Sequence, residues 1–391
     1  MTPFFGRVRA AVSRRGKRAY SFNLEPKESP WKRLPDNVFV ALVAYCRVND
    51  IAALALTCRL LHHRISMNEI LIAQTYLGLR KQARLREDED DADVSPGDEL
   101  TFISELFPPP PPHYALSERH DDAEYSLAYI SDLERCWTTC IQLSYHLADH
   151  AVRHHLETDA IARELWSWKK TEKEYVYSKA VEATQAKLLH PLAYAIFFLE
   201  SSASDDSASN WSDQTTDLSV SIGHQQSILQ RPPFNDTQIL ITVQHCMQLL
   251  CSTVRRLMHP DFPCSSSESW VSLLLLTSTL ERIVQFFAAV AKDEAKQMNA
   301  KHPYSSPGST WSHRKEFMWQ MRDDLSHYLA SSRPSTSGGA KAQPTLDDVW
   351  FGAAYRELVE RSAIPHLAEE PVPVLHGLGI SLRCKHCLGE D

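Results

Sequence analysis

The chain is poor in glycine and lacks the short motifs that usually identify nucleotide-binding and catalytic sites. Only 12 of its 391 residues are glycine. Tight hairpins and the backbone cradles that hold phosphate groups both depend on glycine, so its scarcity argues against an all-β fold and against a nucleotide site. The sequence also contains no phosphate-binding loop, no nucleophile elbow, no kinase motif and no HExxH zinc motif. We therefore expect a protein that is not an enzyme and uses no cofactor.

The chain also lacks an excess of positive charge and a long uninterrupted apolar segment. Its formal net charge is −8, whereas a general nucleic-acid binder needs a basic face that displaces counterions. The most apolar stretch, residues 271–291, carries Glu281 and Arg282 in its middle. It therefore predicts a buried helix and not a membrane span. We expect neither nucleic acid nor a membrane among the partners.

The cysteines suggest no disulfides and complete no zinc site. Their number, nine, is odd, and no secretory signal precedes them, so we expect reduced thiols in the cytoplasm, the nucleus or both. Cys384 and Cys387 form a CxxC pair, but a second pair at a suitable spacing is absent, and His376 and His386 do not replace it. Plain thiols are the favoured interpretation, with zinc ligands or a redox pair as alternatives, and we expect no metal.

The first 24 residues hold six basic residues and no acidic ones: Arg7, Arg9, Arg14, Arg15, Lys17 and Arg18. A solvated basic tail is the favoured interpretation of such a run. A nuclear address at residues 14–18 is an alternative. A mitochondrial presequence is another, because Phe4, Val8 and Val12 fall on one helical face.

Apolar residues recur at three- and four-residue spacing in at least five segments, which is typical of helices that face a core. Three of these stripes are long: 125–147, 239–257 and 273–290. Pro260 ends the second stripe, and Ser265 with Glu268 forms a capping-box pattern ahead of the third. Weak strand signals occur only at 220–222 and 372–380. The sequence thus predicts an all-α fold built from long antiparallel helices.

Composition divides the chain into helical regions and polar segments. An acidic run, a run of five prolines and Ser-rich stretches predict linkers at 86–122, 201–234 and 331–345, the second of them disordered. Ahead of them we expect a basic disordered tail at 1–29. Helical regions should then occupy 30–85, 123–200, 235–330 and 346–391, the third as a long helix pair plus a helix and the last as a helix and a tail.

Two sets of potential metal ligands lie on one predicted helix. Three histidines follow one another at four-residue steps: His146, His150 and His154. They would share one face beside Asp149, where a metal is conceivable, but a solvated polar face beside the apolar stripe is favoured. Cys136 and Cys140 lie within the stripe and are interpreted as buried structural thiols.

Residues 31–66 hold the pattern that points to a function. Two apolar stripes at helical spacing follow one another there, formed by Val38, Leu42, Tyr45, Ile51, Leu54 and Cys58. Pro35 suits the start of the first helix, where its missing amide costs no hydrogen bond. Asp50 is expected to be the N-cap of the second helix, because its carboxylate can accept the free amides of the first turn.

This segment resembles an F-box. That family opens with Leu-Pro and an acidic residue, continues with an aliphatic helix ending in Tyr-Leu, and turns into Asp-Leu and a second helix that carries Val-Cys and basic residues. The matching positions are Leu34, Pro35, Val38, Leu42, Tyr45, Asp50, Ile51, Leu54 and Cys58. Cys46 stands where the family usually has Leu, and Leu61 where it often has Trp or Phe. Both replacements remain apolar, so the helical core is retained.

The resemblance implies a small helical module that docks an exposed apolar face on the Skp adaptor of a cullin–RING ubiquitin ligase. The implied adaptor-binding residues are Leu34, Pro35, Val38, Leu42, Ile51 and Leu54, of which the last two would serve mainly the module's own core. The chain would then be a substrate-receptor subunit whose helical remainder binds an unknown protein target. The alternative is an amphipathic helical pair inside a larger helical scaffold or interaction protein with no ubiquitin role.

Overall fold

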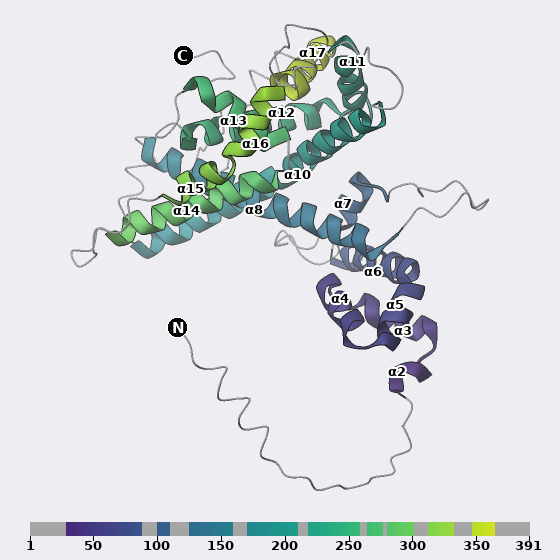
Figure 1. Cartoon of the computed structure of the whole chain (residues 1–391). Coiled ribbons are helices and arrows are strands. Elements are labelled where there is room, and N and C mark those ends of the chain that lie inside the picture. The colour runs from purple at the N-terminus through teal and green to yellow at the C-terminus, as the bar shows by residue number, and fades with distance from the viewer. Residues whose placement is uncertain are drawn as a thin grey trace. The chain divides into compact units, whose positions relative to one another are not determined.

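All secondary structure in the computed structural model is helical over the residues that it describes (Figure 1). These residues are 29–87, 100–109, 125–158, 170–209, 218–258, 264–276, 280–300, 312–331 and 346–363. No strand occurs within them, so the predicted all-α class is confirmed. The chain divides into two compact units, residues 1–75 and residues 76–391, which are described separately below.

Unit 1 consists of short helices. They are α2 (Pro30–Arg33), α3 (Asp36–Ala44), α4 (Val48–Thr57), α5 (Arg59–Met67) and the first part of α6 (Glu69–Glu87). Their apolar side chains meet in a small core: Phe39, Val40, Val43, Ala44, Val48, Ile51, Leu61, Ile65, Ile72 and Ala73. Each helix is too short to be stable alone, so burial in this shared core stabilises the module.

Two details of unit 1 bear on how its helices begin. Pro35 is the N-cap of α3 and adopts an extended conformation, as suits a residue that cannot donate an amide hydrogen bond. Asp50 is not an N-cap, contrary to expectation, because α4 begins at Val48 with Arg47 in the capping position. Asp50 lies instead in the first turn, where its negative charge still complements the helix dipole.

Unit 2 holds the long helices, and the pair α8 (Leu127–Thr158) and α10 (Lys170–Ser209) has the most extensive contact between them. The other elements are α7 (Leu100–Leu106), α11 (Leu218–Leu229), α12 (Thr237–Met258), α13 (Cys264–Leu276), α14 (Glu281–Ala300), α15 (His313–Gln320), α16 (Arg322–Ser331), the π-helical turn η1 (Asp347–Phe351) and α17 (Gly352–Glu360).

An aromatic cluster forms part of the core of unit 2. The rings of Phe198 and Trp350 meet edge to face with centroids 4.8 Å apart, and Phe234 lies 6.0 Å from each of them. The indole nitrogen of Trp350 is buried and donates a hydrogen bond to the side-chain oxygen of Gln244 at 2.8 Å. The cluster thereby joins α10, α12 and η1 while leaving the buried indole donor satisfied.

Two of the predicted linkers contain helix, so those boundaries are wrong. Helix α7 lies inside 86–122, where Leu100, Ile103 and Leu106 are buried at three-residue spacing. Inside 201–234, α10 continues to Ser209 and α11 occupies 218–229, which includes the weak strand candidate. These short apolar sets are diluted by polar neighbours, which is why composition alone missed them.

Arg361 fixes the segment that follows α11. Its guanidinium donates to the carbonyl oxygens of Leu229 at 2.9 Å and Phe234 at 2.8 Å. The same side chain forms an ion pair with the buried Glu357 at 2.8 Å. These charge-assisted contacts and the full burial of Phe234 order the segment after α11, although its composition is that of a linker.

Two expected helices are interrupted. The stripe at 273–290 is shared between α13, which ends at Leu276, and α14, which begins at Glu281. Leu280, directly before α14, adopts a left-handed backbone conformation (φ 64°) that does not fit a right-handed helix. The single helix expected after the long pair in 235–330 is divided at Met321 into α15 and α16. Apolar spacing continues across both interruptions, so it does not reveal them.

Several expectations lie outside the described residues. They concern the basic tail, the linker at 332–345, the strand signal at 372–380, the Cys384–Cys387 pair with its neighbouring histidines, and the side chains of the Ser265–Glu268 capping pattern. Across the part of the chain that is described, no helix combines the length and apolar character needed to cross a membrane.

Candidate functional site

Helix α3 is apolar on both of its faces, and one face builds the core of unit 1. Phe39 is fully buried, and Val40, Val43 and Ala44 are each at least nine-tenths buried. These positions follow the three- and four-residue spacing of a core-facing stripe. A helix whose inner face is already apolar would ordinarily carry polar residues on its outer face.

The outer face of α3 carries apolar residues instead. Pro35, Val38, Leu42 and Tyr45 are separated by three, four and three residues, which places them along one side of the helix. Val38 is 41% exposed, Leu42 49% and Tyr45 75%. We call these four residues the α3 stripe. Leu34, which is half-buried, precedes it in the chain.

Arg64 on α5 holds the start of this surface in place. Its guanidinium donates to the carbonyl oxygen of Leu34 at 2.9 Å, to the carbonyl oxygen of Trp31 and to the carboxylate of Asp36. It also lies over the ring of Phe39, 4.3 Å from the centroid. The Arg64 side chain is only 12% exposed. A single, nearly buried cation therefore holds α2, the residue that follows it and the beginning of α3.

The six residues implied by the F-box resemblance occupy different environments. Pro35, Val38 and Leu42 are exposed on the α3 stripe, and Leu34 and Leu54 are half-buried. Ile51 is fully buried in unit 1, in agreement with its expected role in the module's own core, and its side chain exposes no surface to a partner.

Sequence reasoning missed two residues of this surface. Tyr45 was assigned to the helical stripe but not to the contact set, although its spacing from Leu42 already places it beside that residue. Arg64 has no spacing signal, because its partners precede it by 28 to 33 residues.

The histidine-bearing face of α8 is not the solvated surface that was expected. His146 stacks on Phe287 of α14, with ring centroids 5.6 Å apart and planes 6° from parallel. Burial lowers the pKa of His146, and it lowers the pKa of His150 to about 4. Within the described residues no group of three or more His, Cys, Asp and Glu side chains is placed to hold a metal ion.

Cys140 on α8 and Cys246 on α12 are buried, and their surroundings make both thiols unreactive. Cys140 is fully buried, and a hydrogen bond with the half-buried Cys136 together with burial raises the pKa of its thiol. Burial alone raises the pKa of Cys246 to about 12. Since the thiolate is the nucleophile and the metal ligand, neither role suits these side chains at neutral pH.

Comparison with known proteins gives no relative: no family model, no curated protein and no solved structure matches this chain.

Proposed function

We propose that this protein is the substrate-receptor subunit of an SCF-type cullin–RING ubiquitin ligase. In this proposal the α3 stripe, together with Leu34, docks on a Skp-type adaptor, which connects the chain to a cullin. The observation that carries the proposal is the exposed apolar stripe on a helix whose other face is already committed to a core. The F-box resemblance of residues 31–66 supplies the identity of the partner.

An exposed stripe of this kind is best explained by a partner. Exposed apolar side chains that form a contiguous patch usually mark an interaction site, whereas single ones need no explanation. Anchors at three- and four-residue spacing suit helix-to-groove docking, in which one helical face enters an apolar groove. Arg64 contributes by holding Leu34 and the start of α3 in one geometry, so less conformational entropy is lost on binding.

The remaining parts of the proposal concern unit 2 and the cell. Unit 2 would bind the protein target, whose identity the sequence does not specify. The chain would act by binding and not by catalysis, with no cofactor and no metal of its own. It would work in the cytoplasm, the nucleus or both, where thiols remain reduced.

The test is a pull-down of the full chain with a purified Skp-type adaptor. We expect the wild type to bind and the double variant Leu34→Ala, Pro35→Ala to lose binding with a nearly unchanged helical circular-dichroism signal. Anchors at an interface contribute to the complex more than to the monomer. Loss of helical signal in the double variant would make these residues part of the core.

Two other results would overturn the proposal. Unimpaired binding by a folded double variant would show that the contact lies elsewhere. Failure of the wild type to bind any Skp-type adaptor would remove the ubiquitin role, and the chain would then be a helical scaffold or interaction protein.

A further inference from the structure

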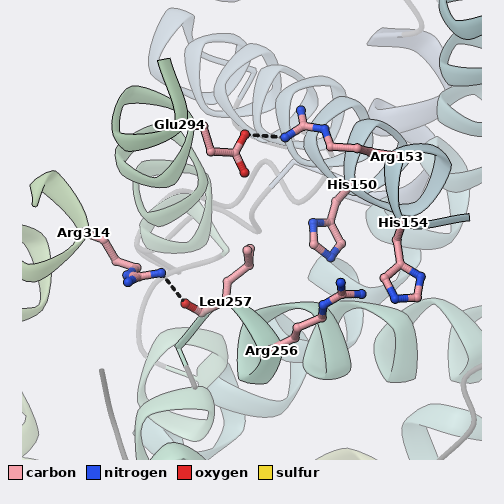
Figure 2. A pocket seen from close by; sticks show the side chains of 7 residues that line it. All are labelled: His150, Arg153, His154, Arg256, Leu257, Glu294 and Arg314. Atoms are coloured by element: carbon pink, nitrogen blue, oxygen red, sulfur yellow. Dashed lines mark hydrogen bonds and ion pairs between the residues drawn. The ribbon is translucent and has the colours of Figure 1, made fainter. Parts of the chain in front are cut away.

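Unit 2 contains a small cavity with a cationic lining, about 200 Å³ in volume, between α8, α12, α14 and α15 (Figure 2). Its charged and titratable lining residues are three arginines, two histidines and one glutamate: Arg153, Arg256, Arg314, His150, His154 and Glu294. Three permanent positive charges therefore face one negative charge around a common space. Like charges repel one another, so an anion bound among these side chains would lower the electrostatic energy.

The carboxylates nearest the cavity are engaged by one of the arginines. Arg153 donates to Glu294 of α14 and to Asp149 one turn earlier on α8. Asp149 also accepts a hydrogen bond from the hydroxyl of Tyr177 on α10. The two carboxylates thus hold the Arg153 side chain at one side of the cavity. The other two guanidinium groups of the lining belong to Arg256 and Arg314.

Arg314 is fixed at its position by the start of α15. Asp293 accepts hydrogen bonds from the backbone amides of His313 at 2.7 Å and Arg314 at 3.0 Å. The guanidinium of Arg314 in turn donates to the carbonyl oxygen of Leu257, near the end of α12, at 2.8 Å. One edge of the guanidinium is therefore held by the carbonyl group at the end of α12, which fixes where the side chain lies at the edge of the cavity.

The two histidines and Arg256 point toward one another (Figure 2). His150 and His154 lie one turn apart on α8 with ring centroids 6.5 Å apart. Arg256 approaches them from α12; it is exposed, and no ion pair joins it to a carboxylate in the described ranges. Burial, and then the charges of Arg256 and Arg153, lower the pKa of His150 to about 4. His150 is consequently neutral at pH 7, with one ring nitrogen able to donate.

We propose that this cavity binds a phosphate-type oxyanion, held by Arg256, His150 and His154 with Arg314 at its edge. Guanidinium and imidazole donors are the groups that recognise tetrahedral oxyanions most strongly. Pockets for drug-sized ligands occupy about 300–1,000 Å³, so a cavity of about 200 Å³ suits a single ion or one phosphate group. The anion would be either a free ion or the phosphate of a larger molecule that reaches the open side.

The competing explanation is that the arginines only complement the end of α12. Basic side chains near a helix C-terminus satisfy its last carbonyl groups, as Arg314 does for Leu257. That explanation predicts no saturable anion binding. The site lies within unit 2 and does not involve the α3 stripe, so the outcome below is independent of adaptor binding.

The experiment is an isothermal calorimetric titration of the full chain at constant ionic strength, once with sodium sulfate and once with inorganic phosphate. We expect saturable binding by the wild type. Arg256→Gln should weaken it at least about tenfold, because a charge-assisted contact to the anion is lost. Arg356→Gln is the matched control, since Arg356 is likewise exposed on a helix of unit 2 and does not line the cavity.

A pH series with sulfate separates a built site from general charge attraction, because sulfate itself does not titrate between pH 5 and 7.5. A bound anion favours protonated His150, so affinity should increase as the pH falls, and His150→Gln should reduce that increase. The charged and titratable groups around His150 are His154, Asp149 and Arg153 of α8, Tyr177 of α10, Arg256 of α12, Glu294 of α14 and Arg314 of α15.

Three results would each overturn the proposal: absence of saturable binding in the wild type, equal binding by Arg256→Gln, or equal loss of binding in Arg256→Gln and Arg356→Gln. If binding is specific, O-phosphoserine serves as a further probe. Tighter binding of O-phosphoserine than of inorganic phosphate would assign the site to phosphorylated side chains, and the reverse would assign it to the free ion.

Discussion

At the scale of single residues, Arg64 is the side chain that most directly connects the fold of unit 1 to its candidate surface. It is nearly buried, and it compensates that burial through two carbonyl oxygens, one carboxylate and the face of Phe39. A buried cation is tolerated only when its donors are satisfied in this way. The backbone around Leu34 therefore depends on an interaction made by a distant helix.

We expect Arg64→Met to lower the free energy of unfolding by roughly 1–3 kcal/mol, because the carbonyl groups of Trp31 and Leu34 lose a charged donor while methionine still packs on Phe39. Chemical denaturation gives the magnitude. Hydrogen exchange of the full chain should show faster exchange in residues 31–44.

The matched control for that change is Asp36→Asn. The Asp36 side chain is 71% exposed, and exposed ion pairs contribute less than about 1 kcal/mol. Destabilisation of equal size in both variants would mean that the ion pair, and not the carbonyl contacts, holds the segment.

The roles of residues could be predicted from the sequence where helical spacing determines them. The prediction failed where contacts in the folded chain determine them. Pro35 before α3 and the shared helical face of Val38, Leu42 and Tyr45 were predictable. Asp50 was misassigned because α4 begins three residues earlier than the pattern suggested. Ile51 was named with the implied contact residues but expected mainly in the core, and its full burial agrees with the core role; a resemblance transfers positions without transferring their burial. No local pattern identifies Arg64.

At the scale of elements, apolar spacing predicted well that the long segments are helical and which of their faces are buried. It predicted poorly where the helices end. Tyr129, Leu133, Cys140, Leu143 and Leu147 are buried along α8 as the stripe requires. The same spacing continues through Leu280, whose left-handed backbone conformation does not fit a right-handed helix. Short helices such as α7 escaped detection because few apolar residues mark them.

The two faces of α3 make opposite predictions for the same kind of substitution. Leu42→Asp should abolish adaptor binding and leave the melting temperature nearly unchanged, because Leu42 is half exposed. Val43→Asp should unfold unit 1, because a carboxylate would replace a buried side chain in the core. Thermal melts and adaptor pull-downs of the full chain distinguish the two effects.

Val359→Asp supplies the control for the exposed face of α3. Val359 of α17 is 48% exposed, which matches the 49% of Leu42, and it lies in unit 2. Adaptor binding should survive this change. Equal loss of binding in both aspartate variants would point to a general effect of added negative charge.

At the scale of the whole molecule, the chain pairs a small unit that exposes an apolar stripe with a large unit whose core buries titratable groups. The histidine face of α8 shows why the second property was not predictable. Its three histidines alternate with apolar positions, and the sequence does not reveal that α12 and α14 cover them. Once covered, the imidazole rings of His146 and His150 lose water, and the protonation of these two side chains becomes linked to the stability of unit 2.

That linkage gives a prediction for acid conditions. His150 has a pKa of about 4 in the folded chain, against 6.5 for an unperturbed histidine. Above pH 6.5 the side chain is neutral in both states, so its contribution is fully present there. As the pH falls from 6.5 toward 4, the unfolded chain takes up a proton that the folded chain resists, and stability is lost. We expect about 2 kcal/mol less stability from His150 at pH 5 than at pH 7.

Thermal unfolding of the full chain in buffers free of sulfate and phosphate measures this loss, and His150→Gln identifies its source. Glutamine stays neutral throughout, so the variant should lose less stability between pH 7 and pH 5 than the wild type. His146, whose pKa burial also lowers, should supply part of the remaining dependence. An unchanged pH dependence in His150→Gln would show that other groups govern the acid sensitivity of unit 2 and that His150 remains hydrated in solution.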